Sequence, residues 1–92
     1  MRILVVEDDR SAGETVRRML LAEGWVVDVV NDGLTGLERA TTESFDVVIL
    51  DIMMPGLNGY EVVRRMRSVG NWTPVLMLTA KDGEYCLLYT SP

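Results

Sequence analysis

The chain has 92 residues, of which 48% are hydrophobic and 25% are charged, and its formal net charge at pH 7 is −5. This composition is typical of one small folded domain and excludes a disordered chain. Because the net charge is negative and no basic cluster is present, nucleic acids and anionic membranes are poor candidates for direct partners of this segment. The single cysteine, Cys86, excludes an internal disulfide and fits a reducing compartment. No apolar run is long enough to cross a membrane or to form a signal-peptide core, so we expect a cytoplasmic protein without membrane contact.

Short apolar runs alternate along the chain with amphipathic segments. The first run, residues 3–6, is β-branched and uninterrupted, as is typical of a strand buried on both faces of a parallel sheet. Residues 11–23 follow with helical periodicity, and Gly24 ends the predicted helix. Its apolar stripe consists of Ala12, Val16, Met19 and Leu20. Residues 25–30 form the second predicted strand, in which Asp28 indicates a sheet edge, since a charge there blocks unwanted strand pairing.

The same alternation continues through the rest of the chain. A turn at residues 31–33 precedes a second helix, which is marked by Leu34, Leu37 and Ala40. Residues 45–50 form the third strand, with a continuous buried run at its end, and residues 51–56 form a loop. Residues 74–79 form the fourth strand.

A third helix lies between the last two predicted strands. Asn58 stands three residues before Glu61, a spacing that resembles a capping box, although Asn replaces the usual Ser or Thr. The apolar positions of this helix are Val62, Val63 and Met66, and its outward positions are Arg64, Arg65 and Arg67.

The order β-α-β-α-β-α-β predicts an α/β fold with an open parallel sheet and helices on both faces. Right-handed crossovers, together with an edge position for the strand that holds Asp28, give the strand order 2-1-3-4. This order puts the carboxyl ends of strands one and three side by side. Such a topological switch point is where these sheets bind ligands.

Chemically active side chains leave the strands at this point. Glu7, Asp8 and Asp9 follow the first strand, Asp51 follows the third, and Thr79 ends the fourth. Each has a structural explanation when taken alone, because acidic runs cap helices, aspartates occupy turns, and threonine suits strands. Converging carboxylates nevertheless repel one another unless a cation joins them. Mg²⁺ prefers such oxygen ligands, whereas a chain without His and with one remote Cys is a poor zinc or redox-metal site.

A nucleophilic aspartate beside Mg²⁺ suits phosphoryl transfer, in which the protein mainly positions groups and neutralises charge. Mg²⁺ would bridge carboxylate and phosphoryl oxygens, and the Thr79 hydroxyl with nearby backbone N–H groups would neutralise further charge. Other phosphate sites match poorly, since neither a P-loop nor a glycine-rich dinucleotide turn follows the first strand. A flavodoxin would have hydroxyl and glycine residues in that loop, and a haloacid-dehalogenase phosphatase would have a D-x-D pattern there.

Three segments together resemble the receiver domain of bacterial response regulators: ILVVEDD at 3–9, VILDIMMPGLNG at 48–59 and PVLMLTA at 74–80. The resemblance covers residues 1 to about 82 and implies a flavodoxin-like fold. It also implies the following roles. Asp51 is the phospho-acceptor, and Glu7 and Asp8 form the acidic pair. Asp8, Asp51 and the backbone carbonyl of Met53 bind Mg²⁺, and Thr79 is the hydroxyl that contacts the phosphoryl group and shifts on activation. Asp9 matches no essential family position and is assigned to helix capping.

Residues 50–56 and 59–61 are most similar to regulators of the OmpR type, in which a winged-helix DNA-binding domain follows the receiver. The resemblance therefore implies a two-component transcription regulator whose phosphoryl donor is a sensor histidine kinase. DNA would be contacted only through a domain outside this chain, and the full-length parent could form a receiver dimer. The chain would be a signalling domain and not an enzyme, acting only on its own phosphorylation and dephosphorylation.

The resemblance stops after the fourth strand. A receiver has five βα units, and the fourth helix, fifth strand and fifth helix are not recognisable here, which would leave strand four as an exposed edge. The family's fifth-strand lysine and coupled aromatic residue are lost with them, and Lys81 is not that lysine by position. We therefore interpret residues 1–82 as a partial receiver domain. Residues 83–92 are interpreted as a non-native or read-through tail, with a divergent loop and helix start as the alternative.

Two other functions stay open at this point. One is a receiver-like interaction module that never accepts phosphate, which the missing lysine favours and the retained acidic residues disfavour. The other is a small aspartate-nucleophile phosphatase, which the first loop disfavours.

Overall fold

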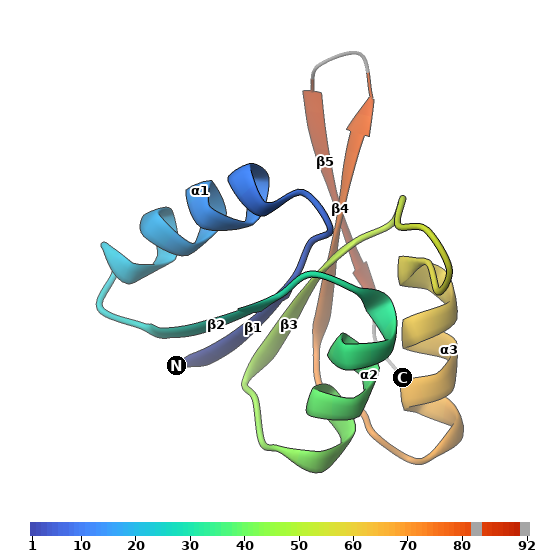
Figure 1. Cartoon of the computed structure of the whole chain (residues 1–92). Coiled ribbons are helices and arrows are strands. Elements are labelled where there is room, and N and C mark those ends of the chain that lie inside the picture. Colours follow the sequence, from blue (N-terminus) through green and yellow to red (C-terminus); the bar gives the residue numbers. More distant parts are fainter. Residues whose placement is uncertain (82–83, 91–92) are drawn as a thin grey trace.

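The computed structural model describes the backbone of residues 1–81 and 84–90 and the side chains of residues 1–78. Its elements, drawn in Figure 1, are β1 (Arg2–Val6), α1 (Arg10–Leu21), β2 (Val26–Val30), α2 (Gly33–Thr42), β3 (Val47–Asp51), α3 (Gly59–Ser68), β4 (Val75–Lys81) and β5 (Glu84–Thr90). Within these residues, no helix combines the length and the hydropathy that crossing a membrane requires.

The strands form one sheet in the order β2-β1-β3-β4-β5, and the first four are parallel. The predicted order 2-1-3-4 is confirmed, and β2 lies at the edge as Asp28 indicated. Neighbouring strands β1 and β3 are in register with Val6 opposite Leu50. The residues that follow Val6 and Leu50 therefore leave the sheet at the same end.

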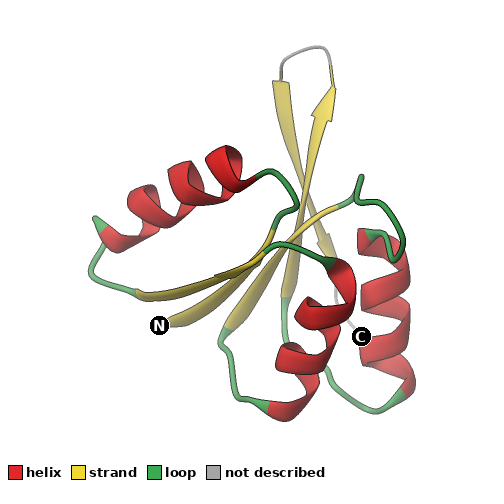
Figure 2. Ribbon diagram, viewed as in Figure 1, coloured by secondary structure: helices red, strands yellow, loops and turns green. Residues whose placement is uncertain are grey.

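Alternate side chains of β1 point to two separate cores, one on each face of the sheet. Ile3 and Val5 pack with the partly buried apolar residues of α1, whereas Leu4 and Val6 pack in the larger core beneath α2 and α3. Figure 2 shows this layering, with α1 on one face and the other two helices on the opposite face. β1 is therefore packed on both faces, up to the point where Glu7 leaves the sheet.

The helix predictions hold for α3 and need correction for α1. Val62 and Met66 are fully buried in α3, and the Asn58 side chain caps this helix by accepting from the Glu61 N–H at 2.9 Å. In α1, Met19 is 67% exposed instead of facing the sheet. Gly13 is buried in that helix, because a residue without a side chain lets α1 approach β2 closely.

Asp28 does more than mark the sheet edge. Its carboxylate pairs with Arg2 at 3.1 Å and with Arg39 at 3.2 Å, and both arginines also pair with Glu43, at 2.6 and 2.7 Å respectively. The Arg2 guanidinium lies 4.4 Å from the centre of the Phe45 ring. This network joins β1, β2 and the end of α2 at the amino end of the sheet.

The expectation that β4 is an exposed edge is wrong. The backbone of β5 pairs antiparallel with β4, from Val75 opposite Thr90 to Lys81 opposite Glu84. Residues 84–90 are rich in β-prone types, which suits them to this pairing. The interpretation of residues 83–92 as a non-native tail stays a prediction, and residues 82–83 and 91–92 lie outside the described part.

Candidate metal centre

Three carboxylates meet where β1 and β3 end. Glu7 and Asp8 directly follow β1, and Asp51 is the last residue of β3. One oxygen of each carboxylate lies within 4.8 Å of the others. The structure thus brings together three of the four acidic residues that the sequence places at the topological switch point, in a geometry that one cation could join.

The backbone of Glu7 is held from the side of β2. Its N–H donates to the carbonyl of Val30 at 3.0 Å, and its own carbonyl accepts from the Asn31 side chain at 2.9 Å. The Glu7 carboxylate accepts from the Asp9 N–H at 3.0 Å. No sequence pattern indicates the contribution of Asn31, because asparagine in a turn is ordinary and its long-range partner is visible only in the fold.

Asp51 is fixed by the start of the loop that follows it. Its Oδ1 accepts from the Met53 N–H at 3.1 Å, and the Ile52 N–H donates to the Leu78 carbonyl at 3.1 Å. The N–H of Gly59, the first residue of α3, donates to the Ile52 carbonyl at 3.0 Å. A Cβ at Gly59 would lie 2.6 Å from the Asp51 carbonyl oxygen, so only glycine lets α3 begin this close to the site.

Two carboxyl groups of the acidic cluster, those of Glu7 and Asp51, have raised pKa values. Burial raises the pKa of Glu7 to about 7, and the negative charges of Asp51 and Asp8 act in the same direction. Burial also raises the pKa of Asp51, while the Met53 N–H opposes this effect. Without a cation, the cluster therefore retains a proton on Glu7 close to neutral pH. A divalent cation would replace that proton and relieve the repulsion.

The donor set fits a hard cation. The cluster offers carboxylate oxygens only, and Asp8 is exposed to solvent, so a bound ion could keep several waters. Mg²⁺ has this preference, whereas Zn²⁺ favours nitrogen and sulfur ligands.

Two other residues that the sequence placed at the switch point, Asp9 and Thr79, are not among the three carboxylates of the acidic cluster. Asp9 lies outside the cluster and caps α1, accepting from the Ser11 and Ala12 N–H groups at 2.9 and 3.2 Å, so its assignment to capping is confirmed. The backbone of Thr79 lies at the same sheet end, one residue beyond the Leu78 that pairs with Asp51, but its side chain is outside the described part.

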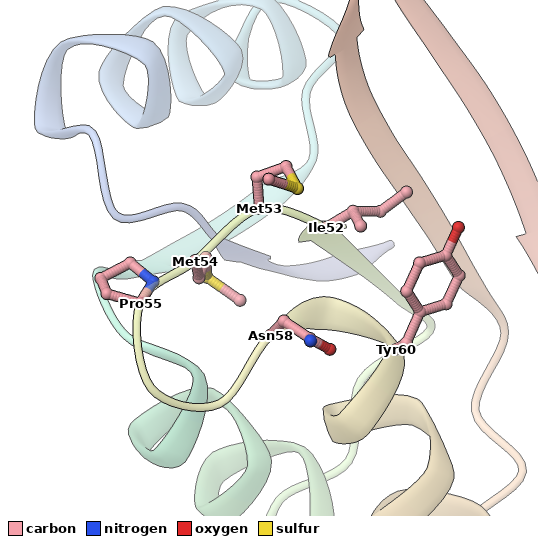
Figure 3. A pocket seen from close by; sticks show the side chains of 6 residues that line it. All are labelled: Ile52, Met53, Met54, Pro55, Asn58 and Tyr60. Atoms are coloured by element: carbon pink, nitrogen blue, oxygen red, sulfur yellow. The ribbon is translucent and has the colours of Figure 1, made fainter.

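Next to the cluster, the loop after β3 borders a hollow of about 540 Å³. Its lining, labelled in Figure 3, consists of Ile52, Met53, Met54, Pro55, Asn58 and Tyr60. No carboxylate lines this hollow. Among the described residues, the side chains that could bind a metal ion are therefore those of the acidic cluster. Met53 is 74% exposed beside Asp51, and its N–H contact places the backbone of this residue against the cluster.

A parallel sheet with helices on both faces and three carboxylates at its switch point defines an open α/β domain whose candidate ligand site lies at the carboxyl ends of its strands. Among such domains, this chain belongs to the response regulator receiver domain family, whose family model matches residues 3–87.

Curated relatives support the same family. Over 80 residues the chain is 50% identical to the probable transcriptional regulatory protein SilR of Salmonella typhimurium, covering 87% of this chain and 35% of that protein. It is 48% identical over 82 residues to the response regulator MprA of Mycobacterium leprae, covering 89% and 36% respectively. The transcriptional regulatory protein CusR of Escherichia coli K12 is 44% identical over 80 residues, with 87% and 35% covered. The chain thus spans about a third of the length of the curated relatives that it matches.

Solved structures agree with this chain in fold, and two of them contain magnesium. The response regulator TrrA of Thermotoga maritima, in complex with Mg²⁺ and BeF, superposes with a TM-score of 0.82 at 36% identity, covering 88% of this chain and 70% of that chain. The receiver domain of the sensor histidine kinase PA1611 of Pseudomonas aeruginosa PAO1 holds a magnesium ion in its active-site cleft. It superposes with a TM-score of 0.82 at 32% identity, covering 87% and 67%. Magnesium in the active site is therefore a feature of the family to which this chain belongs.

Proposed function

We propose that this chain is a phospho-accepting receiver domain that takes a phosphoryl group from a sensor histidine kinase onto Asp51. The observation that carries the proposal is the acidic cluster, in which oxygens of Glu7, Asp8 and Asp51 lie within 4.8 Å of one another. The raised pKa of Glu7 supports it, because the cluster holds a proton where a cation would bind.

Asp8, Asp51 and the backbone carbonyl of Met53 would hold Mg²⁺, with Glu7 completing the acidic pair. Mg²⁺ would supply positive charge beside the phosphoryl oxygens, a role that lowers the barrier to transfer. Of these residues, Asp51 sits at the end of a buried strand and is held by the Met53 N–H at 3.1 Å, which aims one of its oxygens.

In the proposed step, a carboxylate oxygen of Asp51 attacks phosphorus and forms a new P–O bond. The P–N bond to the kinase histidine breaks, and the electron pair remains on the imidazole nitrogen. The product is an acyl phosphate on Asp51, which water later hydrolyses to regenerate the carboxylate and inorganic phosphate. The Thr79 hydroxyl would donate to a phosphoryl oxygen and shift as the domain is activated.

The wider role follows from the relatives. Since SilR and CusR are named as transcriptional regulatory proteins, we infer that the parent of this chain is a cytoplasmic regulator of the OmpR type. It would contact DNA through a separate winged-helix domain and could pair through its receivers. The chain itself would be a signalling switch and not an enzyme acting on other substrates.

The test is incubation with acetyl phosphate and Mg²⁺ followed by intact-mass measurement. A receiver gains one phosphoryl group in the wild type and in Asp9→Asn, which keeps an acceptor at the cap of α1, but gains none in Asp51→Asn. A pure interaction module would bind partners without any gain in mass. A phosphatase would release phosphate from simple monoesters through repeated turnover, which the receiver would not do.

A further inference from the structure

Helix α2 meets the loop after β3 at Gly33. Gly33, the first residue of α2, is buried, and a Cβ added to it would lie 2.1 Å from the carbonyl oxygen of Leu57. Real Cβ atoms essentially never approach another atom within 3.0 Å. The obstructing atom belongs to the backbone of Leu57, which cannot move away as the end of a flexible side chain could. The two backbones therefore lie in direct contact only because residue 33 has no side chain.

Leu57 is a short distance along the chain from the acidic cluster. The next residue, Asn58, caps α3 through its bond to the Glu61 N–H, and Gly59 then donates to the Ile52 carbonyl at 3.0 Å. The loop thus closes on itself, with its last residues bonded to the first residue after Asp51. The hydrogen bond between Gly59 and Ile52 would transmit a displacement of Leu57 to Ile52 and to the Met53 backbone.

We propose that Gly33 is a positioning residue for the metal site: by admitting the Leu57 carbonyl, it sets the loop that carries the Met53 carbonyl beside Asp51. The inference rests on the proposed function, since it assigns Gly33 a part in the same Mg²⁺ site. Gly33 touches neither the ion nor the phosphoryl group.

The far end of α2 offers a matched control. Ala40 is buried in the core at the other end of this helix, and its replacement by glycine removes a methyl group and lowers helix propensity. Ala40→Gly should therefore destabilise α2 without touching the loop. Comparing it with Gly33→Ala separates a change in loop position from a general loss of stability.

The experiment is calorimetric titration of Mg²⁺ into the wild-type chain, Gly33→Ala and Ala40→Gly. We expect the wild type to bind, Gly33→Ala to bind about tenfold more weakly, as is typical when a residue behind metal ligands is changed, and Ala40→Gly to stay within about twofold of the wild type. Wild-type affinity in Gly33→Ala, or an equal loss in both variants, would overturn the inference while leaving the proposed function intact. Absence of binding by the wild type would instead contradict the proposed function.

Amide hydrogen exchange on the wild-type chain keeps the inference testable if Gly33→Ala does not fold. Coupling between sites is reciprocal. If Mg²⁺ binding depends on the contact between α2 and the loop, Mg²⁺ binding must also stabilise that contact. Saturating Mg²⁺ should slow exchange of the Thr35 N–H, which bonds Asp32 in the first turn of α2 at 2.7 Å. Exchange of the Glu43 N–H, bonded to Arg39 at the other end, should not change. Equal effects at both ends, or none at Thr35, would contradict the inference.

Discussion

The Asn31 side chain donates to the carbonyl of Glu7 at 2.9 Å and so ties the end of β2 to the acidic cluster. β2 is an edge strand of the sheet, and its last residue, Val30, also accepts from the Glu7 N–H. Glu7 is therefore held at both its backbone polar groups by residues that arrive from the strand next to it. This arrangement fixes one member of the cluster before any ion binds.

Replacing Asn31 by Ala should weaken Mg²⁺ binding severalfold and lower the free energy of unfolding by about 1 kcal/mol, the usual value of one hydrogen bond. Asn71→Ala is the control, because the Asn71 side chain donates to the Ala40 carbonyl at 2.8 Å, at the opposite end of α2, and accepts from the Thr73 N–H at 3.1 Å. Denaturant unfolding should show a loss of stability in both variants, larger in Asn71→Ala because it removes two hydrogen bonds, and calorimetry should show weaker Mg²⁺ binding in Asn31→Ala alone. Equal Mg²⁺ affinities in the two variants would contradict this account.

Glu7→Gln should stabilise the metal-free protein at pH 8. The folded-state pKa of Glu7 is raised from 4.5 to about 7, so ionised Glu7 opposes folding above pH 7. As pH falls from about 7 toward 4.5, wild-type Glu7 gains its proton in the folded state first, and the difference between the proteins should shrink. We expect an advantage of about 1 kcal/mol at pH 8, allowing for solvent screening of this partly exposed group.

Thermal melts with EDTA and with Mg²⁺ check this prediction. Mg²⁺ should stabilise the wild type more than Glu7→Gln, because the ion binds the cluster that Glu7 completes. Glu23→Gln, at an exposed position near the end of α1, serves as the control, and Mg²⁺ should stabilise it as much as the wild type. A Glu7→Gln variant less stable than the wild type in EDTA at pH 8 would count against the raised pKa.

Glu43→Gln should destabilise the protein at pH 7 but not at pH 2. Hydrogen bonds from Arg39 and Arg2 lower the pKa of Glu43 from 4.5 to about 2. A depressed carboxyl pKa contributes stability above pH 4.5, and this contribution is lost as pH falls toward 2. Denaturant unfolding across this pH range should show the two proteins converging. A stability difference that persists unchanged at low pH would show that the ion pairs are not its cause.

Substitutions at Asp9 and Asp8 should affect different properties, stability in the first case and Mg²⁺ affinity in the second. Asp9→Ala removes the cap of α1 and should lower the free energy of unfolding by about 1 kcal/mol, with Mg²⁺ affinity retained. Asp8→Asn should reduce Mg²⁺ affinity with little loss of stability, since Asp8 is exposed. Unfolding and calorimetry on both variants separate these roles, and a loss of Mg²⁺ binding in Asp9→Ala would show that Asp9 belongs to the site.

The strand order and the acidic cluster were predictable from the sequence because both depend on local patterns. Uninterrupted β-branched runs indicate buried parallel strands, and the carboxyl ends of adjacent strands must meet at one end of the sheet. Asp51 and the pair Glu7 and Asp8 are therefore brought together by topology alone.

The contacts that hold the cluster were not predictable, because they join residues far apart in sequence. The bond from Asn31 to Glu7, the contact of Gly33 with Leu57 and the pairing of Asp28 with Arg39 are all visible only in the fold. The exposure of Met19 was missed for a related reason. Helical periodicity identifies an apolar stripe but does not say how wide a stripe the sheet covers. β5 was not predicted because it pairs antiparallel with β4, whereas the preceding strands follow the parallel βα pattern.

The most direct test of the central claim is to locate the phosphoryl group. The chain is incubated with acetyl phosphate and Mg²⁺, the acyl phosphate is reduced with borohydride, and the modified residue is identified by peptide mass spectrometry. We predict modification at Asp51 alone, none in Asp51→Asn, slower modification in Asp8→Asn, and none when EDTA removes the metal. Modification at Asp8 or Asp9, or labelling that persists undiminished in EDTA, would contradict the account.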